Sequence, residues 1–197
     1  ADDIQIRKMR VRVMELERLG DDVAVVTLQM PPAEPFRYYA GQYIEFILKD
    51  GRRRSYSMAN PPSSDNKVQL HVRHMPGGAF TDHVFGVGAT QMKLREILRV
   101  EGPFGSFFLR EDSDKPIVFL ASGTGFAPIK AIVENMMRQN MTRKAVLYWG
   151  GRRPGDLYLD AQARQWAEQW PGFSYVPVVS DALPEDGWTG RTGFVHQ

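Results

Sequence analysis

The sequence contains no cysteine among its 197 residues. Disulfide bonds, thiolate catalysis and cysteine-ligated metal centres are therefore excluded within this chain. Long apolar runs are also lacking, because the most hydrophobic stretch, residues 116–121, has the length of a strand rather than the about 20 residues of a membrane helix. The N-terminal segment has no apolar core of a signal peptide. These absences lead us to expect a cytoplasmic protein that does not associate with membranes.

An excess of charge of one sign is absent as well. The 25 lysines and arginines nearly balance the 23 aspartates and glutamates, so the formal net charge is +2. Nucleic-acid binding needs a broad basic surface, and this balance argues against one. A hydrophobic fraction of 43% is enough for a buried core, and the length suits one large domain or two small ones.

The first half of the chain has the pattern of an antiparallel β protein. Short runs rich in β-branched and aromatic residues are separated by turn dipeptides such as Gly77-Gly78. The predicted strands cover residues 11–17, 23–30, 43–48, 54–59, 68–74 and 97–100. Six such strands favour a small closed barrel or a sandwich, since closure removes exposed edges. We expect a short helix over residues 80–85, whereas residues 88–100 fit either a helix or a strand.

From residue 116 the pattern changes to alternating strands and helices. Residues 116–121 form a continuous apolar run, as expected of a strand covered on both faces. A helix should follow to about residue 140, because its apolar side chains recur on one face at Ile129, Ile132, Val133, Met136 and Met137. Strands are predicted over residues 145–150 and 173–180, with a helix over residues 158–170 between them.

This order of elements predicts a doubly wound α/β domain with a parallel sheet. The charged segment at residues 110–115 marks the boundary between the two halves. We therefore expect a six-stranded antiparallel β-barrel domain at residues 1–110 and an α/β domain at residues 111–197.

A glycine-rich turn follows the first strand of the second half. Gly123 and Gly125 permit a tight turn and a close approach of the backbone to an anion, and the next helix offers unpaired N–H groups at its start. Pro128 suits the first helical turn. By itself this glycine spacing fits a turn without a ligand equally well.

The stretch "RRRSYS" at residues 52–57 runs three arginines directly into a serine, a tyrosine and a serine. On an extended strand Arg54 and Tyr56 share one face, while Arg53 points to the other. An arginine beside an aromatic ring can bind the phosphate of a nucleotide cofactor or contact a nucleic acid. Taken in isolation, the stretch reads most simply as a solvated basic strand end.

Four motifs in order, "RSYS", "HVRHMPGGAFTDHVF", "EGPFGSF" and "SGTGFAPIKAI", resemble those of the ferredoxin–NADP reductase superfamily. The resemblance covers essentially the whole chain and is nearest to bacterial NADH-dependent flavin and iron–sulfur reductases. These include the CDP-6-deoxy-3,4-glucoseen reductases and the reductase components of aromatic oxygenases.

The resemblance implies an FAD-binding barrel followed by an NAD(P)-binding domain, and thus a flavoprotein oxidoreductase. Such a reductase accepts hydride from NADH onto FAD and passes electrons singly to an iron–sulfur centre. A [2Fe-2S] cluster is expected on a preceding domain or on a partner protein, not in this chain. A downstream oxygenase or dehydrase is among the candidate partners.

The resemblance also assigns residues to the cofactors. Tyr56, stacked on the isoalloxazine, and Ser57, hydrogen-bonded near its N5, are the catalytic candidates, and Arg54 would bind the flavin pyrophosphate. The rest of the flavin site would comprise His71, Val72, Arg73, Gly77, Gly78 and Thr81. The dinucleotide site would comprise Gly123, Thr124, Gly125, Ala127, Pro128 and Asp181.

Asp181 favours NADH over NADPH. It stands where NADPH-dependent relatives carry an arginine, and a carboxylate there repels a 2′-phosphate. Arg152 and Arg153 would favour NADPH, although they read better as solvated loop charges.

No catalytic triad and no metal centre are expected. His71 and His74 are three residues apart on a predicted strand and therefore face opposite sides. Hydride transfer needs no ionised nucleophile in the protein, because the cofactors carry the reaction.

The chain departs from the family pattern at its end. The segment "GRTGFVHQ" at residues 190–197 reads as a turn opening a further helix, and the Cys-Gly-Pro-like motif of the family's next strand is missing. We therefore expect a parallel sheet that is incomplete at the C-terminal end. Two functions stay open: an FAD-dependent NAD(P)H reductase, or a non-catalytic flavin-binding electron-transfer or interaction subunit that takes no hydride.

Overall fold

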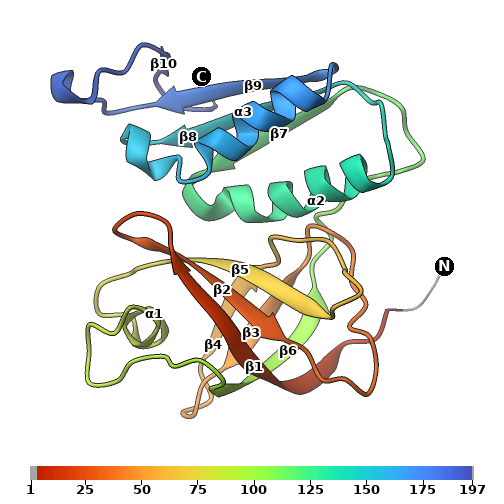
Figure 1. Ribbon diagram of the computed structural model, residues 1–197, viewed down its shortest axis with the longest axis vertical. Coiled ribbons are helices and arrows are strands. Elements are labelled where there is room, and N and C mark those ends of the chain that lie inside the picture. The colour runs from red at the N-terminus through yellow and green to blue at the C-terminus, as the bar shows by residue number, and fades with distance from the viewer. Residues whose placement is uncertain (1–3, 197) are drawn as a thin grey trace.

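The computed structural model describes residues 4–196 and contains two sheets, stacked one above the other in Figure 1. The antiparallel sheet holds β1 (Arg7–Arg18), β2 (Val23–Gln29), β3 (Tyr43–Ile47), β4 (Arg53–Ser57), β5 (Lys67–Arg73) and β6 (Ile97–Phe104). The parallel sheet holds β7 (Ile117–Ser122), β8 (Ala145–Gly151), β9 (Phe173–Val179) and β10 (Arg191–Thr192). The α-helices are α1 (Ala79–Phe85), α2 (Phe126–Arg138) and α3 (Asp160–Gln169), and the 3₁₀ turns are η1 (Gly123–Gly125), η2 (Pro154–Asp156) and η3 (Pro184–Asp186).

The first six strands form the predicted barrel. Their order is β4-β3-β6-β1-β2-β5, and alternate side chains of β1 are buried, so one face of each strand fills a common apolar core. The two ends of the sheet meet just after β4, where Met58 forms a bridge with Leu70 and the amide of Ala59 donates to the Gln69 carbonyl at 2.8 Å. The prediction of a six-stranded antiparallel barrel is thus confirmed.

The boundaries of two barrel strands differ from the sequence-based expectation. β1 begins at Arg7 and β6 runs to Phe104, because the two strands pair with each other and each extends the ladder of its partner. No helix occurs in residues 88–96; a turn through Arg95, whose φ is +71°, leads into β6. The ambiguous stretch at residues 88–100 is therefore a loop followed by a strand.

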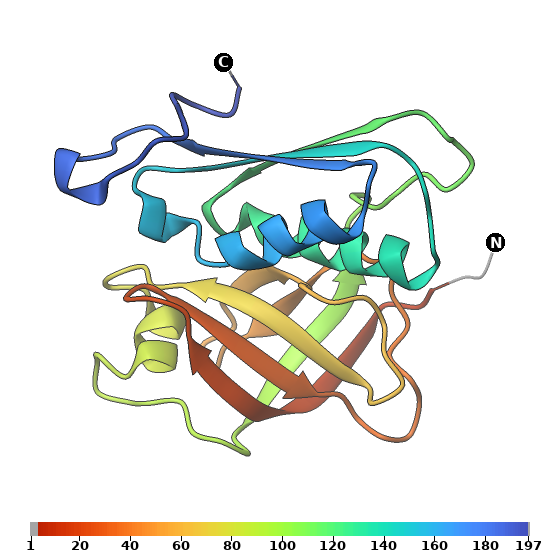
Figure 2. The same cartoon turned by 45° about the horizontal axis from the view of Figure 1, so that its top comes forward.

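The second half is an α/β domain whose four parallel strands follow the order β10-β9-β8-β7. Helices α2 and α3 both lie between this sheet and the barrel (Figure 2). A single apolar cluster contains side chains of both helices together with Phe119, Ala121, Leu147 and Trp149 of β7 and β8. The predicted α/β class with a parallel sheet is confirmed, and among the described residues both helices cover the same face of the sheet.

Two expectations about this sheet were wrong. Residues 116–121 were expected to be covered on both faces, but Val118 and Leu120 are 61% and 55% exposed, because no described element packs on their side of β7. Residues 190–197 were expected to open a helix, but Arg191–Thr192 pair in parallel with β9 and no helix follows up to residue 196. Within the described part of the chain, no helix is long and apolar enough to cross a membrane.

The turn before β3 depends on glycine at position 41. Gly41 has φ +112°, and a Cβ there would lie 2.1 Å from the carbonyl oxygen of Phe107. We expect Gly41→Ala to lower the free energy of unfolding by about 1–3 kcal/mol more than Gly20→Ala, because the clash adds an overpacking cost. Gly20 has φ +93° but no atom within 4 Å of its Cβ position. Gly20→Ala therefore measures the cost of backbone strain without a steric clash. Urea unfolding of both variants measures the difference, and equal losses would contradict the packing at Gly41.

Candidate functional site

The three arginines around the start of β4 have different environments. Arg53 forms ion pairs with Glu45 at 3.3 Å and Glu101 at 2.6 Å, and Arg52 pairs with a carboxylate of the preceding turn at 2.6 Å. The guanidinium of Arg54 donates to the neighbouring carbonyl of Arg53 at 2.8 Å and has no carboxylate partner among residues 4–196. Arg54 is therefore the arginine of this stretch whose charge is available to an anion.

Tyr56 and Ser57 follow Arg54 along β4. The Tyr56 ring is half-buried and lies against Phe46 and Phe80, with ring centroids 5.9 and 5.5 Å away. Burial raises the pKa of Tyr56 to about 12 despite the nearby positive charge of Arg54, so the phenol is neutral. Within the described chain the Ser57 hydroxyl has no hydrogen-bond partner. A guanidinium without a carboxylate partner, an aromatic ring and an unpaired hydroxyl thus lie along β4, and residues of these three kinds can contact the phosphate and the ring of a flavin nucleotide.

The loop before α1 is held in a shape that requires glycine. Gly77 has φ +87°, and a Cβ at Gly78 would lie 3.0 Å from both the Met75 carbonyl oxygen and the Thr81 hydroxyl. The Thr81 hydroxyl accepts from the Met75 amide at 3.1 Å and donates to the Met75 carbonyl at 3.0 Å. Thr81 thus shapes the loop, and contact of these residues with a pyrophosphate stays a prediction.

His71 of β5 faces the second domain rather than solvent. It is 3% exposed, and its Nδ1 lies 2.7 Å from the Tyr158 hydroxyl in the loop before α3. Its Nε2 is buried without a partner in the described part of the chain. Burial, helped by the charge of Lys130, lowers the pKa of His71 to about 3, so the imidazole is neutral.

The next two residues of β5 have different surroundings again. Val72 is fully buried in the barrel core. Arg73 forms an ion pair with Asp22 at 3.2 Å, and its guanidinium lies 3.6 Å from the position that a Cβ would take at Gly123. The charge of Arg73 is therefore placed beside the glycine-rich turn of the second domain.

The glycine-rich turn is the 3₁₀ turn η1, which leads directly into α2. Gly123 has φ +54°, and its carbonyl accepts a hydrogen bond from the Trp149 indole at 3.0 Å. No atom lies within 4 Å of a Cβ position at Gly125, and no side chain caps the start of α2. The Phe126 N–H at the start of α2 donates to carbonyls of this turn, and Pro128 has no N–H, so the N–H groups that can face an anion are those of the uncapped turn η1.

The remaining members of the predicted dinucleotide site lie on the same turn and helix. Thr124 is half-buried, Ala127 is buried, and Pro128 is the third residue of α2, where its missing N–H costs no helical bond. A small hollow of about 10 Å³ joins this turn to the barrel. It is lined by Asp22, Val23, Arg73, Gly123, Thr124, Asp156 and Tyr158. The structure thus brings Arg73, predicted for the flavin, beside Gly123 and Thr124, predicted for the dinucleotide.

Both arginines of the loop after β8 are paired with carboxylates. Arg152 lies 3.4 Å from Asp181, and Arg153 makes two contacts of 2.8 and 2.7 Å with Asp186. The Arg152–Asp181 pair is exposed and therefore weak, whereas the two-point contact of Arg153 is well directed. Arg153 is therefore engaged by Asp186, whereas Arg152 is held only by the weak pair with Asp181.

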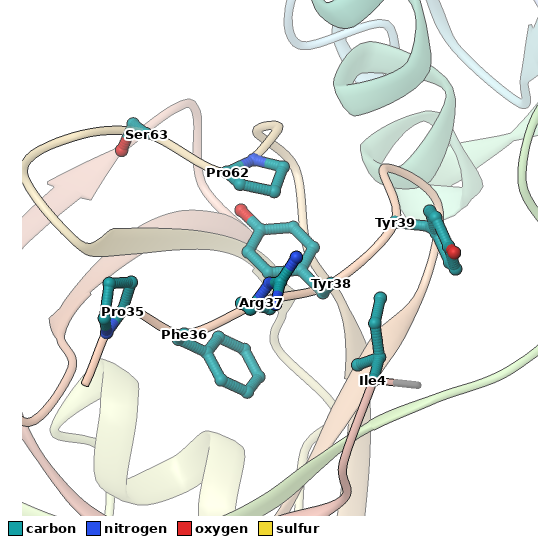
Figure 3. Close-up of a pocket in the computed structure, with 8 residues that line it drawn as sticks. All are labelled: Ile4, Pro35, Phe36, Arg37, Tyr38, Tyr39, Pro62 and Ser63. Carbon is teal, nitrogen blue, oxygen red and sulfur yellow. The ribbon is translucent and has the colours of Figure 1, made fainter. Parts of the chain in front are cut away.

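A separate hollow of about 310 Å³ lies on the barrel (Figure 3). Its lining residues are Ile4, Pro35, Phe36, Arg37, Tyr38, Tyr39, Pro62 and Ser63. None of these residues belongs to the predicted cofactor set. The Tyr38 hydroxyl donates to the Asn60 carbonyl at 2.8 Å, and burial raises the pKa of this phenol. No metal site was predicted, and no group of three or more His, Asp or Glu in residues 4–196 is placed to hold a metal.

Three residues that the sequence did not single out have clear roles in this region. Trp149 holds the glycine turn, Tyr158 contacts His71, and Lys130 is buried between the domains at 9% exposure. A charge directly after Ile129, beside the apolar face of the helix, was a signal for Lys130. Tyr158 left no such signal, because its partner lies 87 residues away in the sequence.

The comparison with known sequences agrees with this geometry. Residues 10–109 match the family described as "Oxidoreductase FAD-binding domain". The chain belongs to this FAD-binding oxidoreductase family. Residues 119–197 match a second description, "Oxidoreductase NAD-binding domain", so the two matches cover the barrel and the α/β half in turn. The resemblance drawn from the sequence motifs is confirmed.

Several relatives that this chain matches are named as reductases. The CDP-6-deoxy-L-threo-D-glycero-4-hexulose-3-dehydrase reductase of Yersinia pestis is 44% identical over 98% of this chain and 56% of that protein. Reductase component 1 of terephthalate 1,2-dioxygenase from Comamonas sp is 40% identical over 94% of this chain and 54% of that protein. The crystal structure of the Amycolatopsis cytochrome P450 reductase GcoB superposes with a TM-score of 0.84 at 35% identity, over 98% of this chain and 56% of that chain.

The fold is therefore that of ferredoxin reductases, with an FAD-binding and an NAD-binding domain. This FAD-binding family member spans about half the length of the curated relatives it matches.

The buried imidazole of His71 makes stability depend on pH. Its pKa is about 3 in the folded protein against an ordinary value of 6.5, so below pH 6.5 the unfolded chain binds a proton that the folded chain does not. The free energy of unfolding should fall by about 1.4 kcal/mol per pH unit from this group as the pH drops from 6.5 towards 3. Between pH 6.5 and 4.5, wild type should lose about 2–3 kcal/mol more than His71→Gln in urea unfolding. Equal losses would show that His71 protonates in the fold.

Proposed function

We propose that this chain is the cofactor-binding part of an NADH-dependent flavin reductase that delivers electrons singly to an iron–sulfur centre. The observation that carries the proposal is the contact between the two predicted cofactor sites at the domain boundary. There Arg73 of the barrel lies beside the turn at Gly123 and Thr124, so a flavin on the barrel and a nicotinamide dinucleotide on the turn would be neighbours. Membership of the FAD-binding family and the second match to an NAD-binding domain support the same reading.

The chain's own residues bind and orient the cofactors in this proposal. Arg54 neutralises a phosphate of FAD, the Tyr56 ring provides a stacking plane, and the Ser57 hydroxyl offers a hydrogen bond to the flavin ring. The N–H groups of the uncapped turn η1, which leads into α2, bind the pyrophosphate of the dinucleotide. When bound, FAD would supply the chemistry that takes up two electrons as a hydride and releases them one at a time. Neutral Tyr56 and His71 add no charge that competes with the cofactors.

The names of the relatives support a proposal for the electron acceptor. Their names describe a dehydrase reductase and a dioxygenase reductase component, which indicates an acceptor in an oxygenase or dehydrase system. We propose a [2Fe-2S] protein or domain as the direct partner, outside the described chain. A cytoplasmic location suits a reductase that draws on NADH, and fractionation of cells expressing the tagged full-length protein tests it.

Anaerobic titration of the purified protein with NADH tests the central claim. The protein should bind FAD, show flavin absorbance, and lose that absorbance when NADH is added. Failure to take up FAD would overturn the proposal altogether. Flavin that binds but stays oxidised over minutes would instead favour an electron-transfer or interaction subunit that takes no hydride.

Tyr56 should contribute directly to flavin binding. Because stacking adds about 0.5–1.5 kcal/mol beyond burial, Tyr56→Ala should weaken FAD binding by about two- to tenfold. Tyr56→Phe keeps the ring and should retain the wild-type affinity. Titration of the apoprotein with FAD, followed by quenching of flavin fluorescence, measures both. An unchanged affinity in Tyr56→Ala would remove this residue from the flavin site.

Asp181 should set the preference for NADH. Asp181→Asn removes a negative charge and releases Arg152, so the affinity for NADPH relative to NADH should rise by about 1 kcal/mol, or about fivefold. Asp114→Asn, an exposed carboxylate in the segment between the domains, is the matched control and should leave the ratio unchanged. Dissociation constants of NAD⁺ and NADP⁺ give the ratio without turnover. A constant ratio in Asp181→Asn would place the ribose elsewhere.

A further inference from the structure

We propose that Lys130 is a positioning residue that fixes the dinucleotide-binding turn against the flavin-binding strand. This inference rests on the proposed function, because it concerns the relative placement of the two cofactor sites. Lys130 belongs to α2 of the α/β domain, yet its ammonium group is buried against the barrel.

The contacts of the ammonium group span the domain boundary. Nζ donates to the Ala59 carbonyl at 3.2 Å and to the side-chain carbonyl of Gln69 at 3.4 Å, both in the barrel. On its own helix it forms an ion pair with Glu134 at 2.7 Å, the residue one turn further on. All three hydrogens of the ammonium thus have an acceptor, two of them in the other domain.

Lys130 lies near both candidate sites along the chain. The helix that carries it begins at Phe126, directly after the glycine turn, so Lys130 lies about one helical turn from the dinucleotide site. Ala59 follows Ser57 by two residues, and its amide donates to the Gln69 carbonyl at 2.8 Å where the barrel closes. A single side chain therefore connects the end of the flavin strand to the start of the dinucleotide helix.

A positioning role explains why a charge is buried here. Removal of an ammonium group from water is costly, and an apolar side chain of the same length would fill the space without that cost. Directed hydrogen bonds to a backbone carbonyl prevent α2 from sliding along the barrel. Apolar contacts alone would restrict this movement less, because they have no preferred direction. The Ala59 carbonyl belongs to the backbone, so it is a fixed reference point.

A second contact prevents rotation about the first. His71 lies two residues after Gln69 on β5, on the same face of the strand, and its Nδ1 contacts the Tyr158 hydroxyl at 2.7 Å. The two interdomain bonds thus use neighbouring positions of one barrel strand. On the other side they reach two separate segments of the α/β domain, α2 and the loop before α3.

The test compares Lys130→Met with Lys130→Arg, and uses Lys144→Met as the matched control. Lys144 is an exposed lysine of the same domain, just before β8. With FAD bound, Lys130→Met should keep FAD affinity within twofold of wild type. The limiting rate of flavin bleaching by NADH should fall at least tenfold, and the change in flavin absorbance on adding NAD⁺ should be altered. Lys130→Arg should recover part of the rate, and Lys144→Met should match wild type.

A second measurement needs no cofactor. Hydrogen exchange of the apoprotein should quicken in Lys130→Met at residues 57–71 and 123–130 together, and stay unchanged in Lys144→Met. Gln69→Met, which removes one acceptor and keeps the ammonium group, should shift the same segments less. If Lys130→Met does not fold, Gln69→Met takes its place in the hydrogen-exchange measurement.

The outcomes separate the positioning role from the proposed function. If NADH does not bleach the flavin of the wild-type protein, the proposed reductase function is contradicted. Hydrogen exchange at residues 57–71 and 123–130 then still tests the role of Lys130. If Lys130→Met matches the wild type in bleaching rate, in absorbance change and in hydrogen exchange, the positioning role is overturned. A variant that is merely less stable, with an unchanged limiting rate and absorbance change, would also overturn it.

Discussion

The burial of α2 on two sides is the constraint on which the rest of the structure depends. One side packs into the core beneath the parallel sheet through residues such as Phe126, Ile129 and Val133. The other side meets the barrel, where Ile132 lies 3.2 Å from the Cβ position of Gly41 and Lys130 contacts Ala59. A helix buried nearly all round cannot shift towards one domain without losing contact with the other. The orientation of its first turn, and thus of the dinucleotide site, follows from the packing of both halves.

Charge pairing decides which cations remain for anionic ligands. Within residues 4–196, Arg53 and Arg153 are held by carboxylates in directed contacts, while Arg54 has no such partner. A surface with nearly equal numbers of acids and bases can therefore still present a local positive charge where the fold leaves one arginine unpaired. The formal net charge of the chain carries no information about this arrangement, since it sums over paired and unpaired groups alike.

Sequence reasoning succeeded where the information is local. The period of two along β4 separates Arg53 from Arg54, and the period of 3.6 along α2 marks its apolar face. The β-rich runs between turn residues predicted the barrel, and the alternation of strands and helices after residue 116 predicted the parallel sheet. The partner of Tyr158 and the exposure of Val118 could not be predicted in this way, because each depends on what lies across a domain boundary or beyond the strand edge. The contacts of Lys130 belong to the same class, although a lysine beside an apolar face was a visible irregularity.

The exposed apolar side chains of β7 lie on the face of the sheet that α2 and α3 do not cover. Val118 and Leu120 are on that face, whereas Phe119 and Ala121 are buried beneath the helices. The glycine turn leaves the end of β7 and enters α2, which lies on the covered face between sheet and barrel. The contacts that place the glycine turn and the start of α2 therefore lie on the covered side of the sheet, at Trp149, Lys130 and Arg73. Lys130 acts on this covered side, since its ammonium group bonds to Ala59 and Gln69 of the barrel.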